Sequence, residues 1–414
     1  MSGNSKKFAI IRNKLHLVDS NGQNEEVVDK IQFNNETVFE LNEKLGSGSY
    51  GTVFSAKKYS EYSTYIDNLA IKFSPIRVSG SHERELAINN IIRESKIPLH
   101  NIVISLGSTI LNNGIFLLFM KLDKTLSAVL YENGCMQLYA IRAVIKQICL
   151  VLCHLELIGM LHTDLKSSNI MLVNHASFPY FVKVIDFGLA SHPSYENGRQ
   201  RVHEPQVMTM RAPEVLLGSR NYSKIDVWSV GYICLQLLLD VLFFDSEGEE
   251  ESKRAILYNI YQLLGQPVAE LNMPMCHFYF NEDGTMNMTD GNRTSHEKRE
   301  RNIPTTFAGI EKYCIQHSYH EQDVKCFIDF LKCVLTWTSE ERITGTEAAK
   351  HSFLSMEHLV EDKEYYEKSL SVMKSALILD VCLKKEEGVA RESDSHILAE
   401  DAKNIPSEHA ASNF

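Results

Sequence analysis

One short polar run restricts the fold and the chemistry of this chain more than any other feature. Residues 162–169 read His-Thr-Asp-Leu-Lys-Ser-Ser-Asn, so Lys166 and Asn169 follow Asp164 by two and five positions. This spacing places a carboxylate, an ammonium group and an amide on one loop. In-line transfer of a phosphoryl group can use them to orient a hydroxyl, neutralise the phosphate and hold a metal ion.

A glycine-rich segment lies upstream of this loop, between two predicted strands. Residues 46–53 read Gly-Ser-Gly-Ser-Tyr-Gly-Thr-Val, and the missing side chains let backbone N–H groups close over phosphate oxygens. Alone, the segment can equally be a tight hairpin, and a dinucleotide-binding fingerprint would need a helix directly afterwards. A strand follows instead. The next strand carries Lys72 between apolar neighbours, where its ammonium can contact the α and β phosphates.

One helix is expected to interrupt these strands. Apolar residues recur with helical spacing over residues 81–96, and Glu85 shares a face with Ile88 and Ile92. Glu85 therefore points inward and is the expected partner of Lys72, because a buried lysine needs a counter-charge. Glu83 lies on another face and is the surface alternative.

Two further motifs follow the polar loop, namely Asp-Phe-Gly at residues 186–188 and Ala-Pro-Glu at residues 212–214. In this order the whole series resembles the eukaryotic protein kinases, over about residues 39–354. The resemblance implies an α+β, two-lobed fold, with a small antiparallel sheet lobe containing one helix and a larger, mostly helical lobe. It also implies transfer of the γ-phosphate of ATP, with Mg²⁺, to serine or threonine hydroxyls of protein substrates, since Lys166 stands two residues after Asp164.

The resemblance assigns roles to individual residues. Phe119 resembles the gatekeeper, and residues 120–122 the hinge whose backbone meets adenine. The expected catalytic residues are Asp164, Lys166, Lys72 and Glu85, and the expected Mg²⁺ ligands are Asn169 and Asp186. ATP contacts are expected at Leu45, Gly46, Gly48, Gly51, Val53, Ala70, Lys72, Phe119, Met120, Leu122 and Leu172. Asp226 resembles the helix aspartate that braces the catalytic loop, and Arg342 the arginine that pairs with Glu214.

Within the kinases, the chain resembles the CMGC group, nearest the dual-specificity tyrosine-regulated, homeodomain-interacting and Cdc2-like kinases. The features that carry this resemblance are His-Thr-Asp at residues 162–164, Arg211, Leu-Leu-Gly-Gln-Pro at residues 263–267 and an insertion at about residues 245–305. The resemblance divides the chain into an N-terminal extension (residues 1–38), a kinase domain (39–354, with lobes 39–122 and 123–354) and a C-terminal tail (355–414).

The chain departs from this family pattern just before Ala-Pro-Glu. Val207 stands where a Ser or Thr hydroxyl usually bonds the catalytic Asp and Lys, while Met208 and Met210 replace a usual arginine and tyrosine. The activation tyrosine of the relatives falls on Glu204, and Thr163 replaces the arginine that clamps an activating phosphate. The alternative hypothesis is therefore a pseudokinase, an ATP-binding interaction module without activity.

Composition excludes several other classes. A net charge of −11 disfavours a sequence-independent grip on nucleic acid, and the sixteen histidines show no metal-ligand spacing. Nine cysteines without a Cys-x-x-Cys pair suit reduced thiols. Residues 143–161 are long enough to span a bilayer but carry Lys146, His154 and Glu156, which favours a buried helix. We expect no membrane anchor, an intracellular location in cytoplasm or nucleus, and a monomer.

Overall fold

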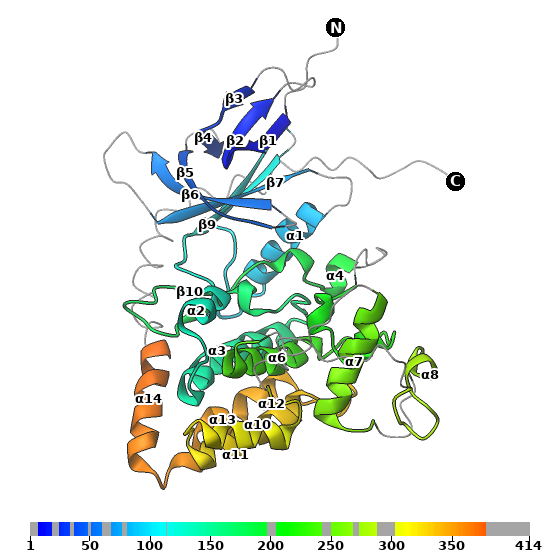
Figure 1. Cartoon of the computed structure of the whole chain (residues 1–414). Helices are drawn as coiled ribbons and strands as arrows, with labels where there is room; N and C mark the ends of the chain where they lie inside the picture. The colour runs from blue at the N-terminus through cyan, green and yellow to red at the C-terminus, as the bar shows by residue number, and fades with distance from the viewer. Residues whose placement is uncertain are drawn as a thin grey trace.

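The computed structural model has a small sheet lobe above a larger helical lobe (Figure 1). This is the two-lobed α+β fold that the sequence predicts. The residues that the structure describes are 7–18, 25–33, 37–48, 51–59, 68–76, 81–112, 114–196, 204–241, 250–267, 273–287 and 303–377.

The N-terminal lobe is built on one antiparallel sheet in the order β4-β5-β6-β7-β9-β8. Alternate residues of its central strands, including Phe54, Ile71 and Phe116, are buried on one face, as the two-residue period of a strand requires. The strands are β4 (Lys30–Phe33), β5 (Thr37–Gly48), β6 (Gly51–Tyr59), β7 (Leu69–Pro75), β8 (Gly107–Leu111) and β9 (Gly114–Met120).

Part of the predicted N-terminal extension belongs to this lobe. Strands β1 (Lys7–Ile11), β2 (Lys14–Val18) and β3 (Glu25–Val27) form a second sheet, and β4 extends the main one. The ring of Phe8 meets Phe116 edge to face at 5.2 Å and Phe73 at 5.9 Å. Both sheets therefore share one apolar core, on the outer face of the main sheet.

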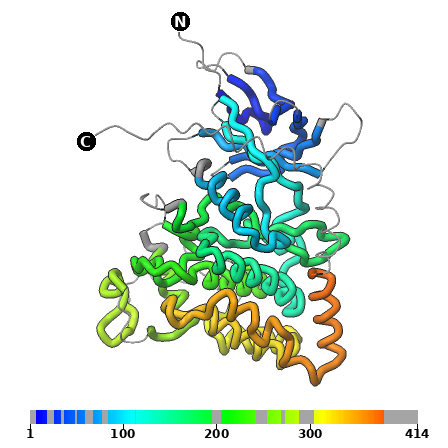
Figure 2. Tube along the Cα trace, turned by 180° about the vertical axis from the view of Figure 1, so that it is seen from behind, coloured from blue at the N-terminus to red at the C-terminus, as the bar shows by residue number. Residues whose placement is uncertain are grey.

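Helix α1 (Ser81–Glu94) lies beside the sheet at the junction of the two lobes, and Figure 2 shows it from behind. Ile88 and Ile92 are fully buried, as the helical spacing predicts. Asn89 donates to the Glu85 carbonyl oxygen at 2.7 Å and accepts from the Ser105 backbone N–H at 2.8 Å. These bonds fasten the helix to the chain that follows it.

The C-terminal lobe packs around two apolar helices, α3 (Leu138–Leu157) and α6 (Ile225–Leu239). Among the described residues, α3 is the one helix long and apolar enough to cross a membrane, and most of it is buried inside the lobe. It is thus the core helix expected over residues 143–161. The surrounding helices are α2 (Leu126–Asn133), α7 (Glu250–Leu264), α10 (Phe307–Gln316), α11 (Glu321–Val334), α12 (Gly345–Lys350), α13 (Ser352–Ser355) and α14 (Lys363–Leu377), with the short α4 (Pro193–Glu196), α5 (Pro213–Leu216) and α8 (Cys276–Tyr279).

Two segments outside the expected core of the domain are integral to this lobe. Helix α7 lies within the predicted insertion, yet Ile256, Leu257 and Ile260 are fully buried, so residues 250–264 belong to the lobe itself. Helix α14 runs along the side of the lobe (Figures 1 and 2) and packs Met373 and Ala376 against α3. It ends at Leu377, the last residue that the structure describes.

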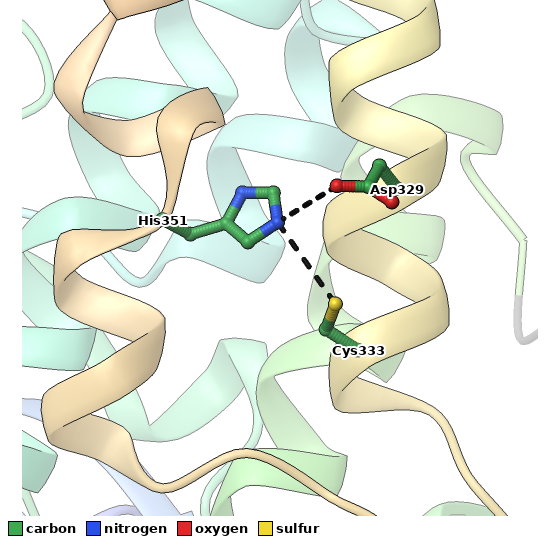
Figure 3. Close-up of side chains that lie close together, drawn as sticks. All are labelled: Asp329, Cys333 and His351. Atoms are coloured by element: carbon green, nitrogen blue, oxygen red, sulfur yellow. Dashed lines mark hydrogen bonds and ion pairs between the residues drawn. The ribbon is translucent and has the colours of Figure 1, made fainter.

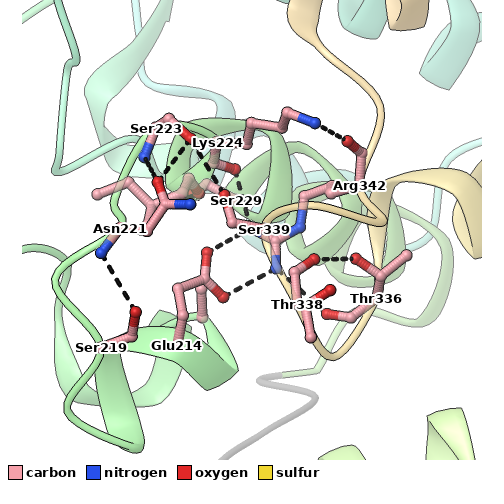
Figure 4. Close-up of polar contacts among 12 residues, drawn as sticks. Glu214, Ser219, Asn221, Ser223, Lys224, Ser229, Thr336, Thr338, Ser339 and Arg342 are labelled. Carbon is pink, nitrogen blue, oxygen red and sulfur yellow. Dashed lines mark hydrogen bonds and ion pairs between the residues drawn. The ribbon is translucent and has the colours of Figure 1, made fainter. Parts of the chain in front are cut away.

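A buried ion pair joins the Ala-Pro-Glu motif to the end of the domain, as the sequence predicts. Both terminal nitrogens of Arg342 donate to Glu214, at 2.6 and 2.9 Å (Figure 4). The same nitrogens donate to the backbone oxygens of Lys224 and Thr336 at 3.0 and 3.2 Å. The guanidinium lies 5.3 Å from the ring centre of Trp228. The pair therefore connects α5, α6 and the loop after α11.

We predict that Arg342→Met lowers the free energy of unfolding by about 3–5 kcal/mol, because Glu214 would remain buried without its counter-charge. Lys325→Met is the matched control, since Lys325 pairs with Glu321 on the surface and its side chain is 59% exposed. That change should cost less than about 1 kcal/mol. Chemical denaturation of both variants measures the difference, and equal small losses would contradict a stabilising role for the buried pair.

Candidate active site

Lys72 stands at the centre of a three-residue charge cluster between the lobes. Its Nζ lies 3.0 and 2.9 Å from the two carboxylate oxygens of Glu85 and 3.0 Å from Oδ1 of Asp186. Lys72 comes from β7, Glu85 from α1, and Asp186 from the chain just after β11 (Val182–Val184). The sequence predicts this pairing of Lys72 with Glu85. The cluster fixes α1, the sheet and the Asp-Phe-Gly segment in one arrangement.

Burial and mutual attraction together set the charges of the cluster. Burial lowers the pKa of Lys72, but the adjacent charges of Glu85 and Asp186 outweigh it and raise the pKa above its ordinary value. Burial raises the pKa of Glu85, and Lys72 opposes this shift. For Asp186, burial works against ionisation, yet Lys72 holds the pKa below its ordinary value. At neutral pH the site therefore presents a lysine cation and an Asp186 carboxylate.

Four of the sheet residues that the sequence assigns to ATP, namely Val53, Ala70, Lys72 and Phe119, share one face of the sheet. In the antiparallel register Val53 lies opposite Lys72, and Ala70 lies opposite Phe119. Directly opposite residues point to the same face, as do residues two apart on one strand. Because Lys72 reaches Asp186, this face is turned toward the C-terminal lobe.

The glycine-rich segment is a hairpin of β5 and β6 whose tip, residues 49–50, lies outside the described residues. Gly46 pairs with Val53, and Gly48 pairs with Gly51. A Cβ on Gly46 or Gly48 would meet no atom within 4 Å, whereas one on Gly51 would lie 2.5 Å from the Phe73 carbonyl oxygen. Gly51 is therefore required by the packing of the sheet. Gly46 and Gly48 leave the backbone of the hairpin uncovered on its open side.

The predicted hinge follows β9, with Met120 and Leu122 at its ends. Met120 is exposed and Leu122 is half-buried. Leu45, directly before the first glycine of the hairpin, is also exposed. Leu172 lies on β10 (Ile170–Leu172), which pairs with β11, and the backbone N–H of Asp123 donates to its carbonyl oxygen at 3.0 Å. The Leu172 side chain is 0% exposed. The structure thus places Leu172 beneath the hinge segment, within the core.

The loop at residues 162–169 gathers its polar groups around Asp164. Lys166 Nζ donates to both carboxylate oxygens, at 3.0 and 2.8 Å, and Asn169 Nδ2 donates to Oδ2 at 3.0 Å. Asn169 Nδ2 also donates to the Asp164 carbonyl oxygen at 2.8 Å. The Asn169 amide therefore binds Asp164 through its nitrogen, and neither of these bonds uses its oxygen.

A buried aspartate on α6 holds the start of this loop. Asp226 accepts from the backbone N–H groups of His162 and Thr163, at 2.6 and 2.9 Å, which is the bracing role expected for it. His162 Nε2 bonds the Ile185 carbonyl oxygen at 3.0 Å, and its ring lies edge-on to Phe187 at 4.8 Å. The loop and the Asp-Phe-Gly segment are therefore fixed to each other as well as to α6.

The segment before Ala-Pro-Glu contains a residue that the sequence analysis missed. Val207 is exposed and carries no hydroxyl, and the adjacent Gln206 is buried with a left-handed backbone at φ 63°. Gln206 is the missed residue, and its backbone N–H donates to the Thr163 carbonyl oxygen at 2.7 Å. Its burial could not be read from the sequence, because a glutamine in a polar loop is usually exposed.

Glu204, where the relatives have a tyrosine, pairs with Arg211 of the same segment. The guanidinium nitrogen Nη1 of Arg211 lies 2.5 Å from a Glu204 carboxylate oxygen, and the Glu204 side chain is 55% exposed. Arg211 Nε also donates to the Gln206 carbonyl oxygen at 3.3 Å. One arginine thus bonds two points of the segment that precedes it.

A second cluster of potential metal ligands lies in the C-terminal lobe (Figure 3). His351 Nε2 is 3.2 Å from Asp329 Oδ2 and 3.9 Å from Cys333 Sγ. The other ring nitrogen, Nδ1, accepts from the Phe353 backbone N–H at 3.2 Å and caps α13. In a neutral ring this bond places the proton on Nε2, the atom that a metal would need. The cluster is therefore assigned as a helix cap in which His351 donates to Asp329.

The oxygen atoms at the lobe junction suit a hard divalent cation. Mg²⁺ prefers oxygen ligands, which the Asp186 carboxylate and the amide oxygen of Asn169 in the Asp164 loop can supply. Lys72, bonded to Asp186, adds a cation suited to phosphate oxygens. These residues fit Mg²⁺ together with a nucleoside triphosphate.

Comparison with known proteins agrees with this site. The family model described as "Protein kinase domain" matches residues 39–354. Homeodomain-interacting protein kinase 1 of Mus musculus is 27% identical over 357 residues, which cover 78% of this chain and 28% of that protein. Homeodomain-interacting protein kinase 2 of Mesocricetus auratus is 28% identical over 367 residues, covering 83% and 30%.

A third relative, homeodomain-interacting protein kinase 4 of Homo sapiens, is 31% identical over 288 residues, covering 62% of this chain and 46% of that protein. The chain thus spans less than half the length of each of these curated relatives. The names confirm the resemblance to the homeodomain-interacting kinases noted in the sequence. With the family model matched over most of its length, and with the motif residues assembled between two lobes, the chain belongs to the protein kinase family.

Proposed function

We propose that the protein is a Mg²⁺- and ATP-dependent kinase that phosphorylates serine or threonine residues of other proteins. The observation that carries the proposal is the Lys72–Glu85–Asp186 cluster, because it aligns the residues that kinases use for phosphate and metal. In the Asp164 loop, Lys166 and Asn169 both donate to the Asp164 carboxylate. All the residues to which the proposal gives a catalytic or metal-binding task are present, namely Lys72, Glu85, Asp164, Lys166, Asn169 and Asp186.

Each residue has a distinct task in this proposal. Lys72 would hold the α and β phosphates, while Asp164 would orient the acceptor hydroxyl and take up its proton. Lys166 would neutralise charge at the γ-phosphate, and Asp186 and Asn169 would hold Mg²⁺. When bound, Mg²⁺ offsets the negative charge of the phosphate oxygens.

The alternative, an inactive ATP-binding module, rests on the replaced side chains at Val207, Met208 and Met210. These replacements alter the segment before Ala-Pro-Glu and leave the Asp164 loop intact, since Lys166 and Asn169 already bond Asp164. The proposal therefore favours activity. It extends to protein substrates, an intracellular location in cytoplasm or nucleus, and a monomer without direct nucleic-acid or membrane binding.

We predict that Asp164→Asn and Asp186→Ala each lower kcat by about 10²–10⁴-fold, because one loses the proton acceptor and the other a metal ligand. A radiometric assay with a generic basic protein and Mg-ATP measures the loss. Asp329→Asn, which changes an exposed carboxylate on α11, is the control and should keep wild-type activity. Wild-type protein that transfers no more phosphate than Asp164→Asn would establish the inactive alternative.

We predict that the acceptor is serine or threonine. Lys166 is the cation of the catalytic loop, whereas tyrosine kinases normally carry an arginine two or four residues after the aspartate, and the latter position is Ser168. Phosphoamino-acid analysis of a substrate phosphorylated in trans measures this directly. Phosphotyrosine as the main product would overturn the assignment of acceptor while leaving kinase activity established.

We predict basal activity without an activating kinase. Thr163 cannot clamp a phosphate, and the Glu204–Arg211 pair already joins the two ends of residues 204–211. Phosphatase-treated protein should therefore keep most of its activity. Glu204→Gln should lower activity by up to about fivefold, since an exposed ion pair contributes at most about 1 kcal/mol.

The control for Glu204→Gln is Glu321→Gln, which removes an exposed ion pair with Lys325 on α11. Loss of nearly all activity on dephosphorylation, with recovery after addition of another kinase, would reject phosphate-free activation. An unchanged rate in Glu204→Gln would show that the Glu204 carboxylate has no role in activity and that packing alone holds residues 204–211.

A further inference from the structure

Gln206 forms a hydrogen bond with every polar atom it has. Besides the bond to Thr163, its side-chain nitrogen donates to the Ile225 carbonyl oxygen at 3.0 Å and to Ser229 Oγ at 2.9 Å. Its side-chain oxygen accepts from the Ala212 backbone N–H at 3.0 Å. Its carbonyl oxygen accepts from Arg211 Nε. A buried side chain with this many partners has one orientation available to it.

Gln206 and the residue that accepts its backbone N–H, Thr163, both have a strained backbone conformation. Gln206 has φ 63° and Thr163 has φ 65°, a region that residues with a Cβ adopt at an energetic cost. The two strained residues are joined by the Gln206 N–H to Thr163 carbonyl bond of 2.7 Å. Such strain persists where surrounding contacts over-determine the structure, and it is concentrated at functional sites.

The peptide groups on both sides of Thr163 are held from two directions. Asp226 accepts the Thr163 N–H, and Gln206 donates to the Thr163 carbonyl oxygen, which belongs to the peptide bond leading into Asp164. Both contacts are anchored on α6. Asp226 lies on that helix, and the Gln206 side chain bonds Ile225 and Ser229 of the same helix.

We propose that Gln206 is a positioning residue for Asp164, which it orients through the Thr163 peptide. The inference rests on the kinase function proposed above and adds a residue to its machinery. Neither usual link between this segment and the catalytic loop is available, because Val207 lacks a hydroxyl and Thr163 lacks a cation. Gln206 supplies the link through its own backbone and anchors it with its side chain.

The test compares Gln206→Met, which keeps the length of the side chain and removes its polar atoms, with Gln206→Glu, which retains an acceptor for Ala212. Gln322→Met, on the exposed first turn of α11, is the matched control. Two quantities are measured well below the melting temperature of every variant. They are kcat with KM for ATP on the basic protein substrate, and hydrogen exchange of the backbone amides of residues 162–169.

Gln206→Met should lower kcat about 10- to 100-fold with KM for ATP within about twofold of wild type, because Asp164 is displaced while the Lys72 cluster is untouched. Amide exchange over residues 162–169 should accelerate. Gln206→Glu should fall between Gln206→Met and wild type, and Gln322→Met should match wild type. A loss that reflected unfolding alone would change the melting temperature and the ATP-binding stoichiometry together with kcat.

Unchanged amide exchange over residues 162–169 in Gln206→Met would overturn the inference. If the wild-type protein is active, a kcat of Gln206→Met equal to that of wild type would overturn it as well. Faster exchange in a protein whose wild type shows no turnover would support the positioning role. That outcome would instead refute the proposed kinase function, so the two failures are distinguishable.

Discussion

The site depends on one buried carboxylate at the start of a core helix. Asp226 accepts hydrogen bonds from the backbone N–H groups of the two residues immediately before Asp164. Its position is fixed because α6 is buried along almost its whole length. A carboxylate removed from water needs such donors. The backbone of a loop, which would otherwise be mobile, thereby acquires the rigidity of the hydrophobic core. Glu214 and Arg342 extend the same support, since Arg342 also bonds the Lys224 carbonyl oxygen at the N-terminal end of α6.

The sequence predicted those parts of the site in which side-chain chemistry has a fixed spacing. Lys72, Asp164 and Asp186 were predicted from motifs that resemble those of the protein kinases, and Glu85 from its place on the inward face of the predicted helix. Gln206 was missed because its importance comes from a strained backbone and from burial, which the residue type does not reveal. The same reason explains α7. It lies within the insertion that the resemblance places at about residues 245–305, and tertiary packing decided that Ile256 and Ile260 are buried.

Residues 204–211 lack side chains that usually order this segment in the family, but other contacts hold it in place. The family pattern there relies on a hydroxyl, a phosphate and cations that receive them. In this chain Glu204 and Arg211 form an ion pair, while the Gln206 side chain bonds α6 directly. The first of these contacts is exposed and weak, and the second is buried and has no charge. Most of the order in this segment therefore comes from neutral hydrogen bonds, which salt and phosphatases do not alter.

The two faces of β7, the strand that carries Lys72, contact different parts of the molecule. Through these contacts the N-terminal residues support the site. Lys72 points toward Asp186, while its neighbours Ile71 and Phe73 point to the opposite face of the sheet, where Phe73 meets Phe8 of β1. Phe8 lies outside the residues that match the family model. An ammonium group can stay within 3.0 Å of two carboxylates only if its strand does not shift. The sheet formed by β1, β2 and β3 covers the face that would otherwise expose Phe73 and Phe116, and so contributes to holding that strand in register with the C-terminal lobe.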